Sequence, residues 1–408
     1  MTEEALNTTD SKISNYQTVD MDGQDLNVAK EPNLFNTKSD ILENDILNIS
    51  EKLLANLLKD HTKAQSLKSQ KKDDFANWPH IIWATNDYKD QNHDFFDEIR
   101  EEDVTGDKGF TIRPRALKER DVQAQRSKDM AEVFTPAWIC NTQNNLIDNQ
   151  WFGREGVFNT EKPDHTWVVN PNKIEFPDKK NWLDYVKDTR MEITCGEAPY
   201  LASRYDTTTG ELIPLKERIG LLDRKLRVVG ENTNTEIEWL SGAFLAVKHI
   251  YGYEFQGDNL LLAREAVLFT VMEYFEDKFK KKLQDYSLNA LEDFSYIISW
   301  NLWQMDGMKL VIPGTCHNTP RIEKKTKNLF GDYSIQVIKE EECEGCKNNH
   351  VLKHNGIACI IKDWSNNCDI DPQKLSIASF KSTKLEFKKV YQDSVFGSNT
   401  DNNSVTPK

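Results

Sequence analysis

The sequence contains no long hydrophobic run. None of its apolar stretches approaches the roughly 18 residues of a transmembrane helix, and the opening MTEEALNTTD is neither basic nor followed by the apolar core of a secretion signal. We therefore expect no membrane partner and a cytoplasmic location. Hydrophobic residues make up only 38% of the 408 residues, which indicates polar tails or long loops beside the core.

Cysteine is also scarce. Seven cysteines, an odd number in a chain of 408 residues, argue against a disulfide framework. Reduced thiols or metal ligands are the roles that remain for them.

Positive charge is in the minority. The formal net charge is -14, and about half of it lies in residues 1–48. Basic residues gather instead in Thr111–Lys128 and Lys381–Val390. Such stretches can contact phosphate even in an acidic chain, and they are equally typical of solvated helix faces.

The distribution of apolar residues predicts four parts. Residues 1–75 combine an acidic tail, expected to be disordered, with a helix or helical hairpin over about 40–67. Residues 76–320 alternate strand-like and helical segments, which predicts an α/β layer fold. A small Cys/His module over 321–385 and a flexible tail over 386–408 follow.

Two segments in the α/β part have features of a ligand site. Thr135-Pro136 is typical of a helix start, because Thr can cap exposed N–H groups and Pro fits the first turn. Further on, a strand beginning at Met191 runs into Cys195-Gly196, and glycine lets a ligand approach the backbone. Taken singly, these segments are equally a capped helix and a plain turn.

A third segment, IYGYEFQGDN, predicts a strand that ends at Glu254 and a helix that begins near Asp258. An acid at the carboxyl end of a strand can bind both hydroxyls of a ribose. A solvated loop carboxylate is the alternative.

A fourth segment, FSYIISWNLWQMDG, predicts a buried strand over Tyr296–Ile298 and then a loop in which two tryptophans flank Asn301. An amide and two large rings directly after a buried strand are candidates for a ligand site.

The order of these four segments resembles the gamma-class DNA N6-adenine methyltransferases. The runs EITCGEAPYLASRYD, IYGYEFQGDNLLLARE and IISWNLWQMDGMK resemble the bacterial proteins known as restriction endonuclease subunit M, over roughly residues 76–365. The resemblance implies a Rossmann-like, S-adenosylmethionine-dependent methyltransferase sheet. It also implies double-stranded DNA as a partner, together with a specificity or restriction subunit.

The resemblance further implies roles for particular residues. The cofactor-binding positions are Phe134, Thr135, Pro136, Glu192, Cys195, Gly196, Ala198 and Glu254. The catalytic loop, which is Asn or Asp followed by Pro-Pro and an aromatic in the family, corresponds to Asn301, Leu302, Trp303 and Gln304. Methylating an exocyclic amine requires acceptors for its hydrogens and a ring on which the flipped base stacks. The resemblance implies Asn301 and the Leu302 carbonyl as the acceptors, and Trp303 or Trp300 as the ring. Both prolines are missing here, so a degenerate methyltransferase fold that only binds DNA is the alternative function.

The stretch between Gly196 and Glu254 is 58 residues long (254 minus 196), against roughly 20 for a bare strand-helix-strand step. We expect an inserted helical element in it. Its basic patch either faces DNA or is solvated and held by i,i+4 pairs; the patch consists of Arg218, Arg224, Lys225 and Arg227.

The segment ECEGCKNNHVLKHNGIACIIKDW suits a structural zinc site. The predicted ligands are Cys343, Cys346 and Cys359 with His354, and His350 is the alternative histidine. Free thiols in a β-hairpin are the other interpretation. A zinc-ribbon-like module here would be the candidate for reading or positioning DNA.

Overall fold

The computed structural model describes residues 42–66, 78–130, 132–327, 333–364 and 383–390. The tails predicted at the two ends therefore lie mainly outside the described residues. All described residues belong to one unit, Lys38–Lys408.

Three short parallel strands form the central sheet. They are β3 (Arg190–Glu192), β4 (Ile250–Glu254) and β5 (Leu302–Gln304), in the order β3-β4-β5. Because the strands are parallel, their carboxyl ends meet at one edge, where doubly wound sheets bind ligands. The predicted strand end at Glu254 is confirmed, whereas the strand expected to run from Met191 into Cys195-Gly196 ends at Glu192, before the turn. The mixed helix and sheet content is compatible with the α/β class.

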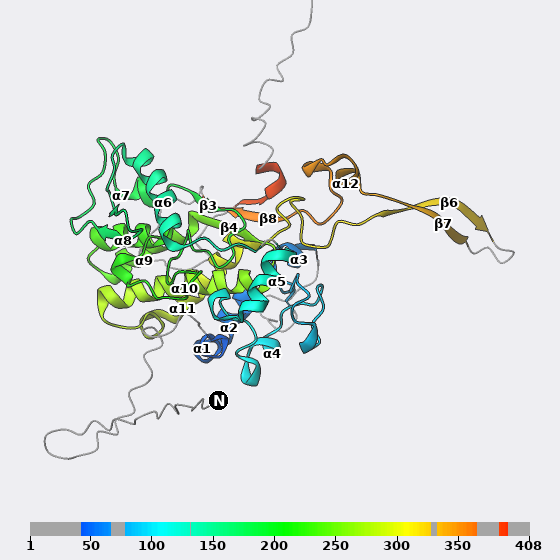
Figure 1. The fold of residues 1–408 in the computed structure, drawn as a ribbon, viewed down its shortest axis with the longest axis horizontal. Helices are drawn as coiled ribbons and strands as arrows, with labels where there is room; N and C mark the ends of the chain where they lie inside the picture. The colour runs from blue at the N-terminus through cyan, green and yellow to red at the C-terminus, as the bar shows by residue number, and fades with distance from the viewer. Residues whose placement is uncertain (1–41, 67–77, 131, 328–332, 365–382, 391–408) are drawn as a thin grey trace, which may run out of the picture. The chain divides into compact units, whose positions relative to one another are not determined.

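Helices cover one face of this sheet. Figure 1 shows α10 (Gly257–Phe279) and α11 (Leu283–Asn301) side by side along the strands, and α10 contacts both β4 and β5. The buried Arg264 of α10 donates to the carbonyls of Leu302 and Ser299, which ties the helix to the start of β5. The burial of all five residues of β4 agrees with its central place.

The opposite face of the sheet is covered by a small hairpin. It consists of β8 (Ile360–Asp363) and β9 (Thr383–Glu386), which pair antiparallel. The Tyr251 hydroxyl donates to the Lys362 carbonyl at 2.9 Å, and the Phe387 ring lies 5.1 Å from that of Trp303. The antiparallel pair β8–β9 therefore covers the face of the central sheet that faces away from α10.

The predicted helical segment before the α/β part is confirmed as three short helices. Their bounds are α1 (Glu43–Ile49), α2 (Glu51–Leu58) and α3 (His61–Ser66). On α2, Asn56 donates to the Ser295 hydroxyl of α11 at 2.8 Å. This part packs on the α/β part through α2 and α11.

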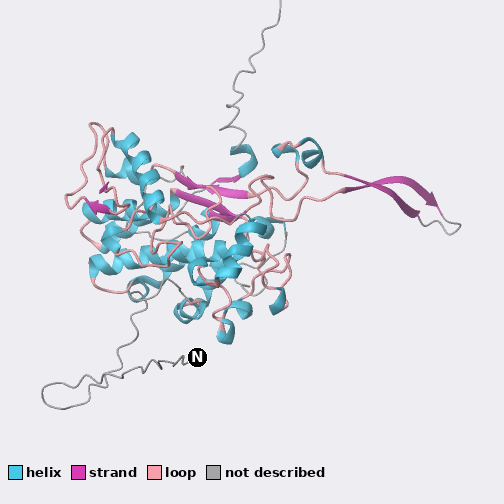
Figure 2. Cartoon of the chain, viewed as in Figure 1, coloured by secondary structure: helices cyan, strands magenta, loops and turns pink. Residues whose placement is uncertain are grey.

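The remaining elements are mostly helical, as Figure 2 shows. The helices are α4 (Glu101–Val104), α5 (Arg120–Met130), α6 (Ala137–Phe152), α7 (Trp182–Val186), α8 (Leu221–Asn232), α9 (Glu236–Lys248) and α12 (Glu344–Asn348). The short 3-10 turns are η2 (Lys89–Gln91), η3 (Gly106–Lys108), η4 (Arg115–Leu117), η5 (Leu215–Glu217) and η6 (Val351–Lys353). Two further antiparallel pairs are β1 (Asn159–Glu161) with β2 (Trp167–Val169), and β6 (Thr319–Lys327) with β7 (Tyr333–Glu341).

One predicted strand is wrong. Tyr296–Ile298 belongs to α11, and the strand begins only at Leu302. The apolar positions Leu291, Phe294 and Ile298 recur at helical spacing and are all buried. A short apolar run does not by itself distinguish a buried strand from a buried helix.

No helix in the described ranges is long and apolar enough to cross a membrane.

Candidate cofactor and metal sites

The glycine turn after β3 lies against the predicted helix start. Gly196 has a φ of +53°, and a Cβ at this position would lie 3.3 Å from Cε1 of Phe134. Cys195 N donates to the Tyr253 carbonyl at 2.8 Å, which holds the turn beside the end of β4. Only glycine combines this φ with so close a neighbour without strain.

Glu254 reaches the same turn from β4. Its Oε2 accepts from Gly196 N at 2.8 Å, and its Oε1 accepts from Gln256 N at 3.2 Å. Burial raises the pKa of this carboxyl, and the backbone N–H groups oppose that rise. Phe134, Gly196 and Glu254 are thus brought together at the carboxyl edge of the sheet, as predicted.

Three other predicted cofactor residues, Glu192, Cys195 and Ala198, are buried in or beside this turn. The buried Glu192 carboxylate accepts from the backbone N–H groups of Tyr200 and Leu201, and burial holds its pKa well above the usual value. Cys195 packs on β4, because a Cβ at Gly252 would lie 3.3 Å from its Sγ. Ala198 is buried with a φ of +60°.

Helix α6 begins after Phe134-Thr135-Pro136, with Pro136 in the N-cap position. The expected capping by Thr135 is wrong: the Asp206 carboxylate accepts from Ala137 N at 2.7 Å, and Thr135 contributes its carbonyl to the Thr207 hydroxyl. A carboxylate from a distant loop cannot be read from the local sequence.

Asn301 lies in the interior and not in an open loop. It is the last residue of α11, and its side chain is fully buried. Its Nδ2 lies 2.9 Å from the carbonyl oxygens of Val247 and Ile250, and its Oδ1 accepts from Trp364 Nε1 at 2.8 Å. The expected placement of Asn301 as an accessible acceptor is therefore wrong.

The groups next to Asn301 are also engaged in contacts within the protein interior. The Leu302 carbonyl accepts from Nε and Nη2 of Arg264, at 2.9 and 2.7 Å. Trp300 stacks on His61 with ring centroids 4.0 Å apart, and Trp303 is buried against Phe387. None of these groups is available to a flipped base in this conformation.

The polar residue that follows β5 at the carboxyl edge is Asp306. Met305 N donates to the Glu254 carbonyl at 2.9 Å, which places the end of β5 beside the end of β4. The Asp306 carboxylate accepts from Met308 N at 3.0 Å and lies 3.5 Å from Lys309 Nζ, with about a tenth of its side chain exposed. Sequence reasoning missed this residue because the strand was placed too early by several positions.

Several cationic side chains from the two basic stretches expected at the surface are buried and have partners in the interior. Lys118 and Arg126, from the Thr111–Lys128 stretch, both pair with the buried Asp258. Arg224 pairs with Asp148, and Lys225 Nζ donates to the Val186 carbonyl at 2.8 Å.

Those four side chains therefore face neither DNA nor solvent. The expected inserted helices are confirmed as α8 and α9, and Arg227 makes the i,i+4 pair with Glu231.

Four side chains converge near the ends of the β6–β7 hairpin. They are Cys316, Cys343, Cys346 and His354, whose ligand atoms all lie within 4.8 Å of one another. Zn–S and Zn–N bonds of about 2.3 and 2.0 Å at tetrahedral angles require S···S of about 3.8 Å and S···N of about 3.5 Å. The Cys316–Cys346 Sγ distance is 3.7 Å, and His354 Nδ1 lies 3.5 Å from each of these sulfurs and 3.8 Å from Cys343 Sγ. The cluster fits a metal ion such as zinc.

One predicted ligand is corrected by this arrangement, and the choice between the two histidines is decided. Cys359 is buried and donates its Sγ hydrogen to the Gln304 carbonyl at 3.4 Å, outside the cluster, and Cys316 takes its place. His350 Nδ1 accepts from Leu352 N, which leaves His354 as the histidine ligand. Cys316 was missed because 26 residues separate it from Cys343, and only the hairpin brings them together.

The thiols differ in acidity. Burial opposes ionisation of Cys343, but backbone N–H groups of Cys346 and Asn355 point at its sulfur and lower its pKa to about 6. Burial and the neighbouring thiols raise the pKa of Cys316 to about 11. One ready thiolate in the set favours the first metal–sulfur bond.

No family model, curated protein or solved structure matches this chain.

Proposed function

We propose that this protein binds S-adenosylmethionine and methylates N6 of adenine in double-stranded DNA as the modification part of a restriction-modification system. The observation that supports it best is the meeting of Phe134, Gly196 and Glu254, which are far apart in sequence, at the carboxyl edge of a parallel sheet. That edge is where doubly wound sheets bind nucleoside-containing ligands.

The residues at this edge suit the cofactor in kind. The positive φ of Gly196 and the lack of a side chain leave its backbone open to a ligand, and Glu254 offers carboxylate oxygens for ribose hydroxyls. Phe134 contributes an apolar surface beside them. When bound, S-adenosylmethionine would supply an electrophilic methyl group.

Asp306 is the acceptor that we assign to the amine. It follows β5 at the same edge, and a carboxylate can accept hydrogens from an exocyclic amine as the nitrogen becomes a nucleophile. Asn301 cannot take that role, because its amide is fully used in the interior.

A second function is favoured by that same burial of Asn301. A chain that keeps the cofactor edge without the family's open acceptor loop would serve as a non-catalytic DNA-binding subunit. In both cases we assign zinc to the Cys316, Cys343, Cys346 and His354 cluster as a structural ion, and propose a cytoplasmic protein with a specificity or restriction subunit as partner.

The test uses the full chain, duplex DNA of varied sequence and methyl-labelled S-adenosylmethionine, with nucleoside analysis for N6-methyladenine. Equilibrium dialysis measures cofactor binding separately. Asp306→Ala should abolish label transfer and keep cofactor binding, whereas the exposed Asp178→Ala should change neither.

Each outcome decides between the candidates. Label on adenine that depends on Asp306 supports the methyltransferase. Cofactor binding and DNA binding without label support the non-catalytic subunit. Absence of cofactor binding to a folded protein refutes both assignments of the sheet edge.

A further inference from the structure

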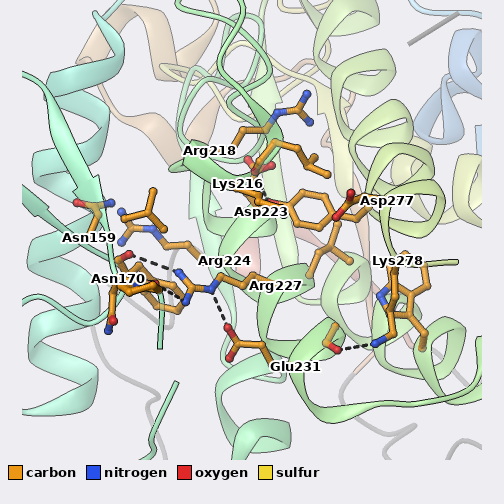
Figure 3. A pocket seen from close by; sticks show the side chains of 18 residues that line it. Asn159, Asn170, Lys216, Arg218, Asp223, Arg224, Arg227, Glu231, Asp277 and Lys278 are labelled. Atoms are coloured by element: carbon orange, nitrogen blue, oxygen red, sulfur yellow. Dashed lines mark hydrogen bonds and ion pairs between the residues drawn. The ribbon is translucent and has the colours of Figure 1, made fainter. Parts of the chain in front are cut away.

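A cavity of about 350 Å³ lies away from the sheet edge, among α8, α9, the end of α10 and the β1–β2 hairpin. Figure 3 shows the side chains that line it. On α10, its lining residue Lys278 lies 21 residues beyond Gly257 (278 minus 257), or about 30 Å along the helix from the carboxyl edge. The cavity is therefore distinct from the proposed cofactor site, and its volume is within the range of small-molecule sites.

Part of the lining of the cavity is apolar and aromatic. Phe158, Leu226, Trp239 and Tyr274 contribute to it, and Trp239 and Leu226 are almost fully buried. No described residue accepts a hydrogen bond from Trp239 Nε1, so its indole N–H is available to a ligand. A planar, apolar molecule matches such a lining.

The charged residues around the cavity are mainly cationic. Five lining residues are Lys or Arg and three are Asp or Glu. Arg227 is engaged by Glu231, as Figure 3 shows, and Arg218 by Glu273. Lys216 and Lys278 pair with no carboxylate in the described part of the chain, so the surplus is positive and favours an anion.

Arg224 is held by polar partners outside the cavity. It lines the cavity with about 1% of its surface exposed, and its Nη atoms bond Asp148, Asn141 and Asn145. Its Nε has no partner among the described residues but is itself inaccessible, so Arg224 offers no donor to a ligand in the cavity.

Gly230 provides an independent indication that the space is used. It lies inside α8, where glycine weakens a helix. Its φ is not positive, and a Cβ there would meet nothing closer than Trp239 Nε1 at 4.0 Å. Neither backbone conformation nor packing requires glycine at this position, and any side chain would reduce the cavity.

We propose that this cavity is a second binding site, which takes a small aromatic anion with its ring against the aromatic lining residues and its carboxylate or phosphate among the cations. The site is independent of the proposed methyl transfer, since none of its lining residues lies at the carboxyl edge of the sheet.

Saturation-transfer NMR on the full chain tests this with two probes, benzoate for the carboxylate and adenosine 5′-monophosphate for the phosphate. We expect saturation transfer to at least one probe with the wild type, and the stronger probe identifies the anionic group. Gly230→Leu should abolish the signal by filling the cavity, with circular dichroism confirming that the variant is folded.

Lys216→Met keeps the test decisive if Gly230→Leu does not fold. Removing this cation should weaken the binding of the active probe about three- to tenfold. The matched variant Lys162→Met, at an exposed cation away from the cavity, should not change it. Lack of transfer to either probe, or equal binding by Lys216→Met and the wild type, would overturn the proposal.

Discussion

Replacing Asn301 by alanine should strongly destabilise the protein and not merely inactivate it. The substitution removes the donor to the carbonyls of Val247 and Ile250 and the acceptor of Trp364 Nε1. Val247 lies in the last turn of α9 and Ile250 begins β4, so the amide joins a helix end to the central strand. The side chain is fully buried, which prevents water from replacing it.

The expected cost follows from the number of groups left unsatisfied. Each buried polar group without a partner costs about 1–3 kcal/mol, so the three groups together sum to about 3–9 kcal/mol. We expect the lower part of this range, about 3–5 kcal/mol, because single substitutions rarely cost more. A typical domain has only about 5–15 kcal/mol of unfolding free energy, so Asn301→Ala should remove a large part of it.

Urea denaturation followed by circular dichroism measures this effect. The control is Asn234→Ala at an exposed position, which should change the unfolding free energy by less than about 0.5 kcal/mol. If Asn301→Ala kept wild-type stability and cofactor binding but lost methyl transfer, the structural role argued here would be refuted and a catalytic role restored.

Three further predictions concern the helical glycines and the metal cluster. Gly230→Ala should raise the unfolding free energy by about 0.5–1 kcal/mol, because alanine favours a helix and nothing is crowded there. Gly242→Ala in α9 should lower the unfolding free energy by about 1–3 kcal/mol, because its Cβ would lie 2.7 Å from Val229 Cγ1. Equal shifts of the two variants in urea denaturation would contradict this. Cys316→Ser should lower the zinc content measured by atomic absorption, and Cys359→Ser should leave it unchanged; the reverse would restore the ligand set expected from sequence. Zinc binding near neutral pH should release at least one proton, because the pKa of Cys316 is raised to about 11 and its thiol must ionise to bind the metal. Calorimetry in buffers of different ionisation enthalpy measures this release. If no proton were released, Cys316 would be excluded as a ligand.

The end of β4 was predictable because its signal is local. Glu254 follows an apolar segment, and the glycine turn at Gly196 is visible in the sequence, although the strand before it ends earlier than expected, at Glu192. The interior role of Asn301 was not visible, because its partners lie about 50 residues earlier and 63 residues later in the chain.

Buried cations mark a second limit of sequence reasoning. In the sequence, Lys118 and Arg126 belong to a basic stretch that was expected at the surface. Only the position of Asp258 in the structure shows that they form ion pairs in the interior. The sign and spacing of charges do not indicate which of them pair across the fold. The same applies to Arg224, whose partner Asp148 lies on another helix.

The metal ligands lie on both sides of the β6–β7 hairpin, with Cys316 before β6 and Cys343 after β7. A bound ion would therefore connect the start of β6 to the end of β7, whatever the length of the hairpin between them. Doubling a closed loop adds only about 0.6 kcal/mol of closure entropy. Hairpins of different length and sequence could thus be exchanged at this position without rebuilding the sheet or the ligand set.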